Sequence, residues 1–186
     1  MNDSGVRRML PVAVTLIGLL AGGLLSLGLR PATAQTCEFY TWTGGPDRDV
    51  KTDTVGRRDT WYMRGGPDYG RSLACDDPAI YGEDGGDDIG GGSGDDYLLG
   101  GNQEDAVYGG QGDDGLSGDA GGDNIYDLEG PNTGAPNDVD VGEGKGGDDR
   151  IEFNDGDTYD LAIGGAGTDV CVTDSRPIEE DSTCES

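Results

Sequence analysis

"GGSGDDYLLGGNQEDAVYGGQGDDGLS", residues Gly91 to Ser117, contains one nine-residue phrase three times in succession. Each row opens with two glycines, carries an acid at its sixth position and has an apolar residue at its eighth. Rows with the same spacing begin at Gly82, Gly91, Gly100, Gly109 and Gly118. A short internal repeat of constant length is typical of a solenoid, in which each repeat stacks on its neighbours.

The sixth and eighth positions indicate how one row folds. The sixth residues are Asp87, Asp96, Asp105, Asp114 and Asp123, and the eighth are Ile89, Leu98, Val107, Leu116 and Ile125. A six-residue turn followed by three residues with an apolar one in the middle predicts a short strand with one inward side chain. Two rows would make one lap of a flattened coil, and successive laps would stack as parallel strands.

Apolar burial is too weak to hold such a coil together. Ordering nine residues costs on the order of 10 kcal/mol or more, whereas burying one Ile, Leu or Val returns roughly 1.5–3 kcal/mol. Stacked strands lie about 4.8 Å apart, and two carboxylates at that distance repel by roughly 3 kcal/mol at an effective dielectric of about 20. Calcium binds oxygens at about 2.3–2.6 Å, so one ion can reach ligands on two stacked turns. The repeat therefore predicts Ca²⁺ as the cofactor.

The composition favours cations as partners and disfavours polyanions. The chain has 186 residues with 37 Gly, only 33% hydrophobic residues and a formal net charge of −26. Such a balance ordinarily indicates disorder, but the nine-residue period argues against disorder here. A strongly acidic surface repels phosphate backbones and anionic lipids, so we expect no nucleic-acid partner.

Residues 1–34 have the pattern of a signal peptide. Arg7 and Arg8 precede the apolar run from Met9 to Leu29, and the small residues Ala32 and Ala34 then predict cleavage before Gln35. Removing three arginines and one aspartate leaves 9 basic and 37 acidic side chains, a net charge of −28. We therefore expect a secreted, extracellular protein with no membrane contact after signal removal. The alternative is a retained membrane anchor, since the run is long enough to span a bilayer.

Four cysteines, Cys37, Cys75, Cys171 and Cys184, remain in the exported part. An even number in an exported chain favours disulfides. Of three possible connectivities, the local one joins Cys37 to Cys75 and Cys171 to Cys184, which would close each end of the coil. Zinc is the competing interpretation, but the chain has no CxxC spacing and no His.

These rows resemble the RTX, or haemolysin-type, calcium-binding repeat, written G-G-x-G-x-D-x-U-x with U apolar. "GGSGDDYLL" and "GGQGDDGLS" match every fixed position, and "GGAGTDVCV" at 164–172 matches with Cys171 in the apolar position. "GKGGDDRIE" at 144–152 fits with Lys145 in second place, and "DGDTYDLAI" at 155–163 keeps Gly156, Asp160 and Ala162.

The resemblance implies an all-β fold, a right-handed parallel β-roll stabilised by calcium between every second row, here with caps closed by disulfides. The implied metal ligands are the sixth-position acids and the glycines of the two fully matching turns. They are Asp87, Asp96, Asp105, Asp114, Asp123, Asp149, Asp160, Asp169, Gly91, Gly92, Gly94, Gly109, Gly110 and Gly112. RTX proteins typically leave the cell by an uncleaved C-terminal signal, so the family's export route does not transfer to this chain.

The repeats divide the chain into six segments and single out one calcium site. We expect a signal peptide at 1–34, an N-terminal cap with degenerate repeats at 35–81, repeat blocks at 82–126 and 144–172, an insertion loop at 127–143 and a C-terminal cap at 173–186. In alternating rows, Glu83, Gln103 and Asp119 replace glycines. The tightest calcium site should therefore lie between Asp96 and Asp114, whose rows keep every glycine.

These features predict a secreted calcium-binding protein with a structural or interaction role, no enzyme activity, and an extracellular protein or glycan as possible partner. The absence of His removes Ser-His triads and HExxH zinc sites. One alternative is an adhesion or carbohydrate-binding module, which would expose Trp42 and Trp61. The other is a carboxylate-dependent hydrolase, which is disfavoured because acids spread over the whole chain fit a ligand column better than one catalytic pair.

Overall fold

The computed structural model describes residues 37–53, 56–127, 139–153, 160–173 and Cys184. The described residues form β-strands and turns and contain no helix, so none of them makes a helix that could cross a membrane. The expected signal peptide at 1–34 lies outside the described residues. The expectation of an all-β fold is confirmed.

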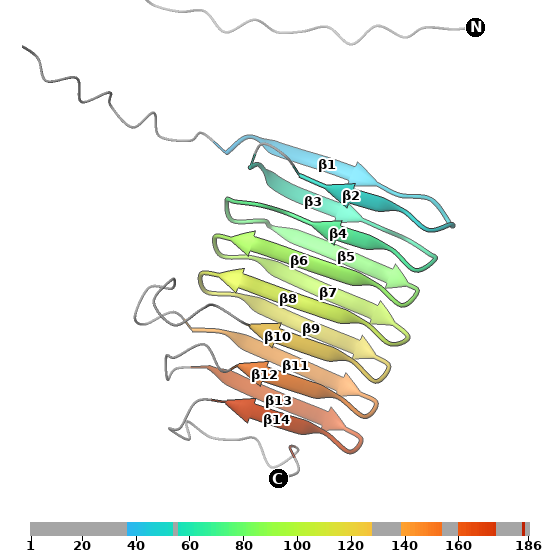
Figure 1. The fold of residues 1–186 in the computed structure, drawn as a ribbon, viewed down its shortest axis with the longest axis vertical. Coiled ribbons are helices and arrows are strands. Elements are labelled where there is room, and N and C mark those ends of the chain that lie inside the picture. Colours follow the sequence, from blue (N-terminus) through green and yellow to red (C-terminus); the bar gives the residue numbers. More distant parts are fainter. Residues whose placement is uncertain (1–36, 54–55, 128–138, 154–159, 174–183, 185–186) are drawn as a thin grey trace, which may run out of the picture. The chain divides into compact units, whose positions relative to one another are not determined.

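The strands form two seven-stranded parallel sheets, and consecutive strands alternate between them (Figure 1). The first sheet contains, in spatial order, β1 (Phe39–Thr43), β3 (Arg58–Tyr62), β5 (Ala79–Asp84), β7 (Tyr97–Asn102), β9 (Gly115–Ala120), β11 (Val141–Gly146) and β13 (Leu161–Ala166). The second contains β2 (Val50–Thr52), β4 (Tyr69–Arg71), β6 (Asp88–Ser93), β8 (Ala106–Gln111), β10 (Asn124–Asp127), β12 (Arg150–Phe153) and β14 (Val170–Thr173). Two rows therefore make one lap of a parallel solenoid, as the repeat predicts.

The core is a single file of side chains between the two sheets. Eighth-position residues stack directly, with Ile80 paired to Leu98 and Leu98 to Leu116 in the first sheet. The buried cluster consists of Trp61, Met63, Ile80, Ile89, Leu98, Val107, Leu116, Ile125, Ile151, Phe153 and Ala162. Trp42 and Cys171 pack against it and are partly buried. Each lap thus adds only about two side chains to the core, as a thin solenoid requires.

Two core positions are glycines, and a neighbouring large side chain fills each. A Cβ added at Gly70 would lie 2.6 Å from Cε of Met63, and one at Gly142 would lie 2.5 Å from Cζ of Phe153. Met63 and Phe153 are both fully buried. The core therefore stays filled in rows that lack the repeat's apolar residue.

The coil continues through the interruption of the nine-residue register. Strand β9 pairs with β11 and β10 with β12, although residues 128–138 separate the two pairs in sequence. Asp127 ends β10 and Val141 begins β11. The sequence predicts an insertion loop at 127–143. Both ends of that segment are strand residues, and its middle lies outside the described residues.

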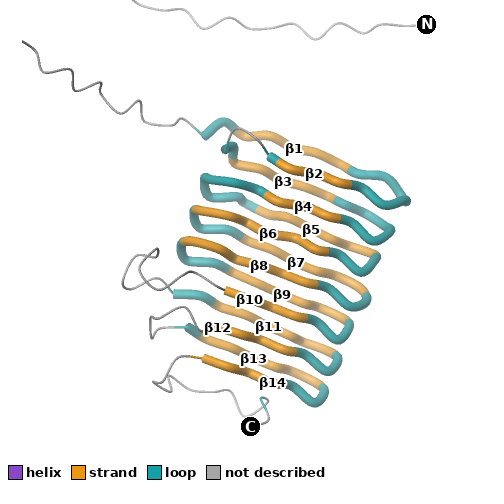
Figure 2. The backbone as a smooth tube through the Cα atoms, in the orientation of Figure 1, coloured by secondary structure: helices purple, strands orange, loops and turns teal. Residues whose placement is uncertain are grey.

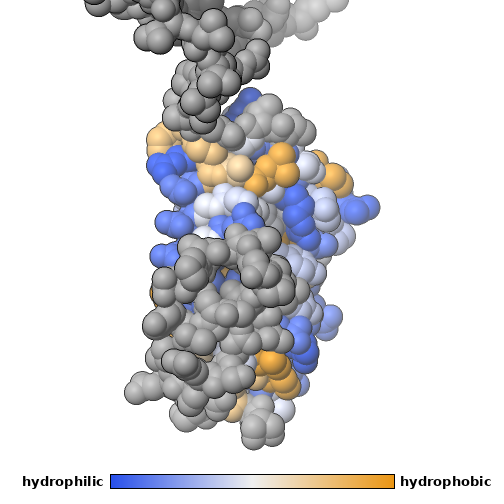
Figure 3. Space-filling model, turned by 60° about the vertical axis from the view of Figure 1, so that its left-hand side comes forward, coloured by the Kyte–Doolittle hydropathy of each residue, from blue (hydrophilic) through white to orange (hydrophobic). Residues whose placement is uncertain are grey.

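The degenerate rows before Gly82 form laps of the same coil. Strands β1 to β4 pair in the same two sheets as the regular rows. Figure 2 shows these strands and their turns stacked in line with those that follow. At this end the large apolar side chains of Phe39 and Val50 are 76% and 65% exposed. Elsewhere the face shown in Figure 3 is mostly hydrophilic, with scattered apolar patches.

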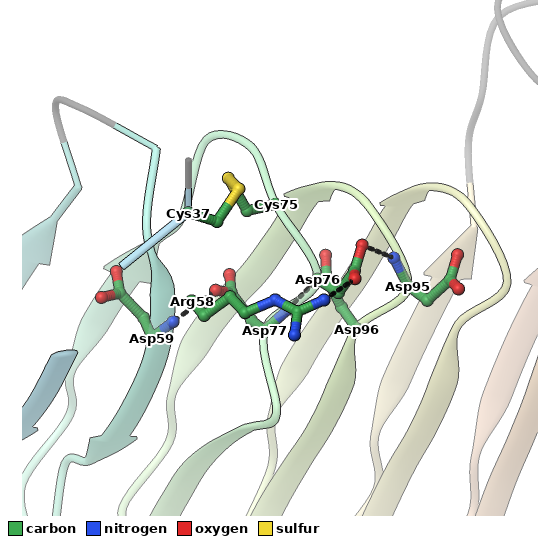
Figure 4. The surroundings of a disulfide bond; sticks show 8 residues. All are labelled: Cys37, Arg58, Asp59, Cys75, Asp76, Asp77, Asp95 and Asp96. Atoms are coloured by element: carbon green, nitrogen blue, oxygen red, sulfur yellow. Dashed lines mark hydrogen bonds and ion pairs between the residues drawn. A yellow bond between two sulfur atoms is a disulfide. The ribbon is translucent and has the colours of Figure 1, made fainter. Parts of the chain in front are cut away.

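Both expected disulfides are present. Cys37, just before β1, is bonded to Cys75 in the turn between β4 and β5, with 6.1 Å between their Cα atoms (Figure 4). Cys171 in β14 is bonded to Cys184, with 5.6 Å between their Cα atoms. Each bridge joins residues at one end of the coil, and the described residues include no free cysteine.

Six described residues other than glycine adopt left-handed backbone conformations, namely Arg64 and Cys75 and four that belong to the rows of the repeat. Glu83, Gln103, Asp119 and Lys145 have φ angles of 74°, 82°, 74° and 72°. All four lie where the chain passes from the first sheet to the second. Each costs on the order of 1–2 kcal/mol relative to glycine. Glu83, Gln103 and Asp119, which replace glycines of the repeat, thus keep the left-handed conformation that glycine adopts readily.

Candidate metal centre

Sixth-position aspartates stack into two ladders, one at each side of the coil where the chain passes between sheets. The first ladder, leading into the first sheet, contains Asp59, Asp77, Asp96, Asp114, Asp140 and Asp160. The second ladder, leading into the second sheet, contains Asp49, Asp68, Asp87, Asp105, Asp123, Asp149 and Asp169. All but Asp49 are buried.

One hydrogen bond recurs at every step of both ladders. The backbone N–H of each aspartate donates to Oδ1 of the aspartate one lap further on. The N–H of Asp96 donates to Asp114 over 2.8 Å, and Figure 4 shows the steps from Asp59 to Asp77 and from Asp77 to Asp96. The predicted stacking of Asp96 on Asp114, and of Asp87, Asp105 and Asp123 on one another, is confirmed.

At least seven of the described ladder aspartates have a second carboxylate oxygen that lacks a donor. Among the described residues, Oδ2 is buried without a hydrogen-bond partner in Asp68, Asp87, Asp96, Asp105, Asp123, Asp149 and Asp169. These side chains are at most 4% exposed. A buried carboxylate oxygen with no donor is costly unless a cation or a proton neutralises it. The ladders therefore supply oxygen ligands whose partner comes from outside the chain.

The glycine at the first position of each row makes room for that oxygen. A Cβ added at Gly91 would lie 2.1 Å from Oδ2 of Asp96, and one at Gly109 would lie 2.4 Å from Oδ2 of Asp114. The same conflict recurs at Gly82, Gly100, Gly118, Gly144 and Gly164, at distances of 2.2 to 2.6 Å. The φ angles of these glycines are not in the left-handed region. Glycine is needed here for space and not for backbone freedom.

The remaining glycines of the fully matching turns bring backbone carbonyls against the next lap. Gly92, Gly94, Gly110 and Gly112 have φ angles of 107°, 119°, 121° and 118°. A Cβ added at Gly110 would lie 2.2 Å from the carbonyl oxygen of Gly92. A Cβ added at Gly112 would lie 2.5 Å from the carbonyl oxygen of Gly94. Carbonyl oxygens thus stack in the same turns that carry Asp96 and Asp114.

Burial makes the ladder carboxylates hard to ionise when no cation is bound. It raises the pKa of Asp96 and of Asp105 to about 8, and the N–H donors from Asp77 and Asp87 offset it only in part. Burial also raises the pKa of Asp77, Asp87 and Asp123 to about 6. A proton or a metal ion can each neutralise the buried oxygen, so the two compete for these sites.

Basic side chains do little to neutralise the ladders. The ion pairs on the described surface join Arg58 to Asp76, Arg71 to Asp88, Lys145 to Asp119 and Arg150 to Glu152. The exceptions lie near the N-terminal end: Arg48 lowers the pKa of Asp68, although burial raises it more, and Asp59, the first member of its ladder, also has basic neighbours. Lys51 and Arg57 lower its pKa, although burial and Asp53 raise it more.

The donor set fits a hard cation. It consists of carboxylate and carbonyl oxygens, the ligands that Ca²⁺ and Mg²⁺ prefer. All four cysteines are in disulfides and the chain has no His, which removes the soft ligands typical of zinc sites. The buried aspartates can therefore hold a metal ion bound through oxygen.

Every aspartate predicted from the sequence lies in one of the two ladders, and the predicted glycines lie in the turns beside the first. The sequence analysis missed Asp49, Asp59, Asp68, Asp77 and Asp140. The rows of Asp59, Asp77 and Asp140 lack all three glycines and the row of Asp68 keeps one, whereas the row of Asp49 keeps two, so that its GG and acid could have been recognised. A fixed 18-residue spacing does not reach most of them, since Asp68 precedes Asp87 by 19 residues and Asp77 precedes Asp96 by the same number. It also missed Asp127, a buried acid at a first position.

No protein-family model, no curated protein and no solved structure matches this chain. The geometry of the aspartate ladders therefore carries the functional inference.

Proposed function

We propose that this chain is a secreted calcium-binding solenoid of the RTX type, which folds on binding calcium and serves a structural or interaction role without catalysis. One observation carries the proposal: buried Oδ2 atoms without donors recur along both sides of the coil. The described residues supply no donor to Oδ2 of Asp96 in the first ladder, or to Oδ2 of six aspartates from Asp68 to Asp169 in the second, which supports a requirement for cations along the coil.

Calcium suits the ladders better than magnesium. It accepts six to eight oxygens at about 2.3–2.6 Å in variable geometry, whereas magnesium demands near-octahedral ligands at about 2.0–2.1 Å and gives up water reluctantly. A lap rise of about 4.8 Å places oxygens of successive turns at the separation that one calcium ion can bridge. Carboxylates and the stacked carbonyls of Gly92 and Gly94 are ligands of the type it prefers.

The disulfides support an extracellular location for this role. The two disulfides favour an oxidising compartment, where extracellular modules bind calcium at about 10⁻⁴ to 10⁻³ M. An ion that binds only the folded form stabilises it by mass action. Folding would then follow export, because calcium outside the cell is abundant enough to fill the ladders.

The alternatives gain less support. A carbohydrate-binding face built on tryptophan would expose Trp42 and Trp61, but Trp61 is fully buried and Trp42 packs against the core. A hydrolase would need one carboxylate pair set apart from the rest. The acids instead repeat with the same hydrogen bond at each step, which favours a shared ligand role.

A metal titration tests the proposal. Residues 35–186 would be purified with both disulfides, freed of calcium, and followed by far-UV circular dichroism and calorimetry. We expect β-structure to increase with calcium but not with equal magnesium. If the calcium-free protein has the same spectrum and radius as the calcium-loaded protein, and calorimetry shows no binding heat, the proposal is wrong.

A further inference from the structure

The coil contains one carboxylate cluster that the repeat does not predict. One carboxylate oxygen from each of Asp114, Asp127 and Asp140 lies within 4.8 Å of the other two. Asp114 and Asp140 are successive members of the first ladder. Asp127 is the last residue of β10 and stands at a first position, where the preceding two laps have Gly91 and Gly109.

Glycines of the preceding lap leave space for the extra carboxylate. Oδ1 of Asp127 accepts the backbone N–H of Gly110 over 3.0 Å. A Cβ at Gly109 would lie 2.9 Å from that oxygen and 2.4 Å from Oδ2 of Asp114. The side chain of Asp127 thus reaches back over the preceding turn and lies beside the first ladder.

A second observation indicates that this cluster takes a ligand. Asp140 is 0% exposed, and its Oδ1 accepts the N–H of Asp114 over 2.7 Å. No N–H or hydroxyl group among the described residues donates to its Oδ2, and the carboxyl of Asp127 lies close enough to interact with that of Asp140. Asp127 is also 0% exposed and Asp114 is 2% exposed. Three carboxylates brought together away from water, one with a buried oxygen that lacks a donor, need a multivalent cation to stay charged.

We infer that Asp114, Asp127 and Asp140 form a three-carboxylate calcium site that holds the coil in register across the interruption of the repeat. Ligands each 2.3–2.6 Å from one ion can span the separations within this cluster. Asp127 precedes residues 128–138, and Asp140 immediately precedes β11. An ion bound here joins the end of one repeat block to the start of the next. The inference rests on the proposed function in taking calcium as the ligand.

Calorimetric calcium titration of residues 35–186 tests this site with a matched pair of variants. Asp127→Asn keeps an oxygen for the Gly110 N–H but removes the charge. Asp95→Asn makes the same change at an exposed acid of the first side of the coil, whose Oδ1 accepts the N–H of Asp113. We expect Asp127→Asn to weaken one calcium-binding step at least about tenfold, because even the loss of a group that only supports the ligands of a metal site typically costs this much affinity. Asp95→Asn should leave every calcium-binding step unchanged.

Hydrogen exchange at limiting calcium gives a second measurement. Amides of residues 139–173 should exchange faster in Asp127→Asn than in the wild type, and those of residues 56–111 should not. If Asp127→Asn fails to fold, Asp127→Gly restores the residue of the regular repeat, and it should fold at saturating calcium while lacking the same step. If the wild type binds calcium and the titration of Asp127→Asn or Asp127→Gly equals that of Asp95→Asn, the inference about the three-carboxylate site is wrong, but the proposed function stands. A wild-type chain that takes up no calcium overturns the proposed function.

Discussion

Substituting one first-position glycine would test whether space for the carboxylate organises the ladders. A Cβ at Gly91 would lie 2.1 Å from Oδ2, 2.7 Å from Cγ and 2.8 Å from Cβ of Asp96. Real Cβ contacts are not this short, so Gly91→Ala forces the Asp96 side chain to move. Because Gly91 has an ordinary φ angle, the backbone itself tolerates alanine, and any effect comes from the displaced carboxylate.

The expected cost follows from what Asp96 would lose. Its Oδ1 accepts the N–H of Asp77 over 2.7 Å, and a hydrogen bond to a charged group contributes roughly 1.5–3 kcal/mol. With calcium bound, the displaced carboxylate would also leave its ion. We therefore expect Gly91→Ala to lower the free energy of unfolding in saturating calcium by at least about 2 kcal/mol.

Gly146→Ala is the matched control. Its added Cβ would lie 3.8 Å from the nearest atom, the carbonyl oxygen of Asp119, and its φ angle is also ordinary. Alanine there should be neutral, or should stabilise the protein by up to about 1 kcal/mol through a less flexible unfolded chain. Urea unfolding followed by circular dichroism measures both variants under the same conditions. Equal unfolding free energies for the two would refute the steric role of the first-position glycine.

Two further predictions use the same protein. Because burial raises the pKa of Asp96 and Asp105 to about 8, the calcium-free folded form binds more protons than the unfolded chain between their ordinary and raised pKa values. The stability of the calcium-free form should therefore rise as the pH falls from about 8 toward about 5, and circular dichroism measures this trend. Calcium affinity should fall over the same pH range, which calorimetric titration of calcium-free protein measures. Calcium-free protein that is more ordered at the higher pH would contradict the predicted stability trend. In calorimetric calcium titrations, Asp114→Ala should lose the tightest binding step and Asp123→Ala a weaker one. The reason is that the turns on the side of Asp123 carry Glu83, Gln103 and Asp119 at positive φ. The reverse order would show that the ranking of the two sides is wrong.

The regular rows could be predicted because period, apolar position and acid position agree in each. From Gly82 to Tyr126 the spacing alone gives the strands, the core and the stacking of Asp96 on Asp114. The disulfides could be predicted because each local pair belongs to one end of the coil. In these parts every level of the sequence indicates the same structure.

The irregular rows could not be predicted because distant side chains compensate for what each row lacks. Met63 fills the core at Gly70, and Phe153 fills it at Gly142, from first positions where the repeat has glycine. Laps before Asp87 run to 18 or 19 residues, so a fixed count loses the register there. Asp127 becomes meaningful only once β10 is known to pair with β8 and β12 on either side of it.

Basic side chains are concentrated at the N-terminal end of the coil. Six of the nine basic residues of the exported chain lie between Arg48 and Arg71. Lys51 occupies a core-facing position, aligned with Gly70 and Ile89. Its Nζ lies 4.7, 5.9 and 5.7 Å from the ring centroids of Tyr40, Trp42 and Trp61, an arrangement in which aromatic faces stabilise a cation.

The same lysine attracts Asp59, the first carboxylate of its ladder, and Arg57 does so too. The first lap thus combines a counter-charge for the ladder with a cover for the open end of the core, which the next lap provides elsewhere. Terminal repeats of a solenoid need such a cap because one face has no neighbour. Under the proposed function, the ladder can therefore begin beside a lysine, and calcium would first be needed at the next step, where Asp77 meets Asp96.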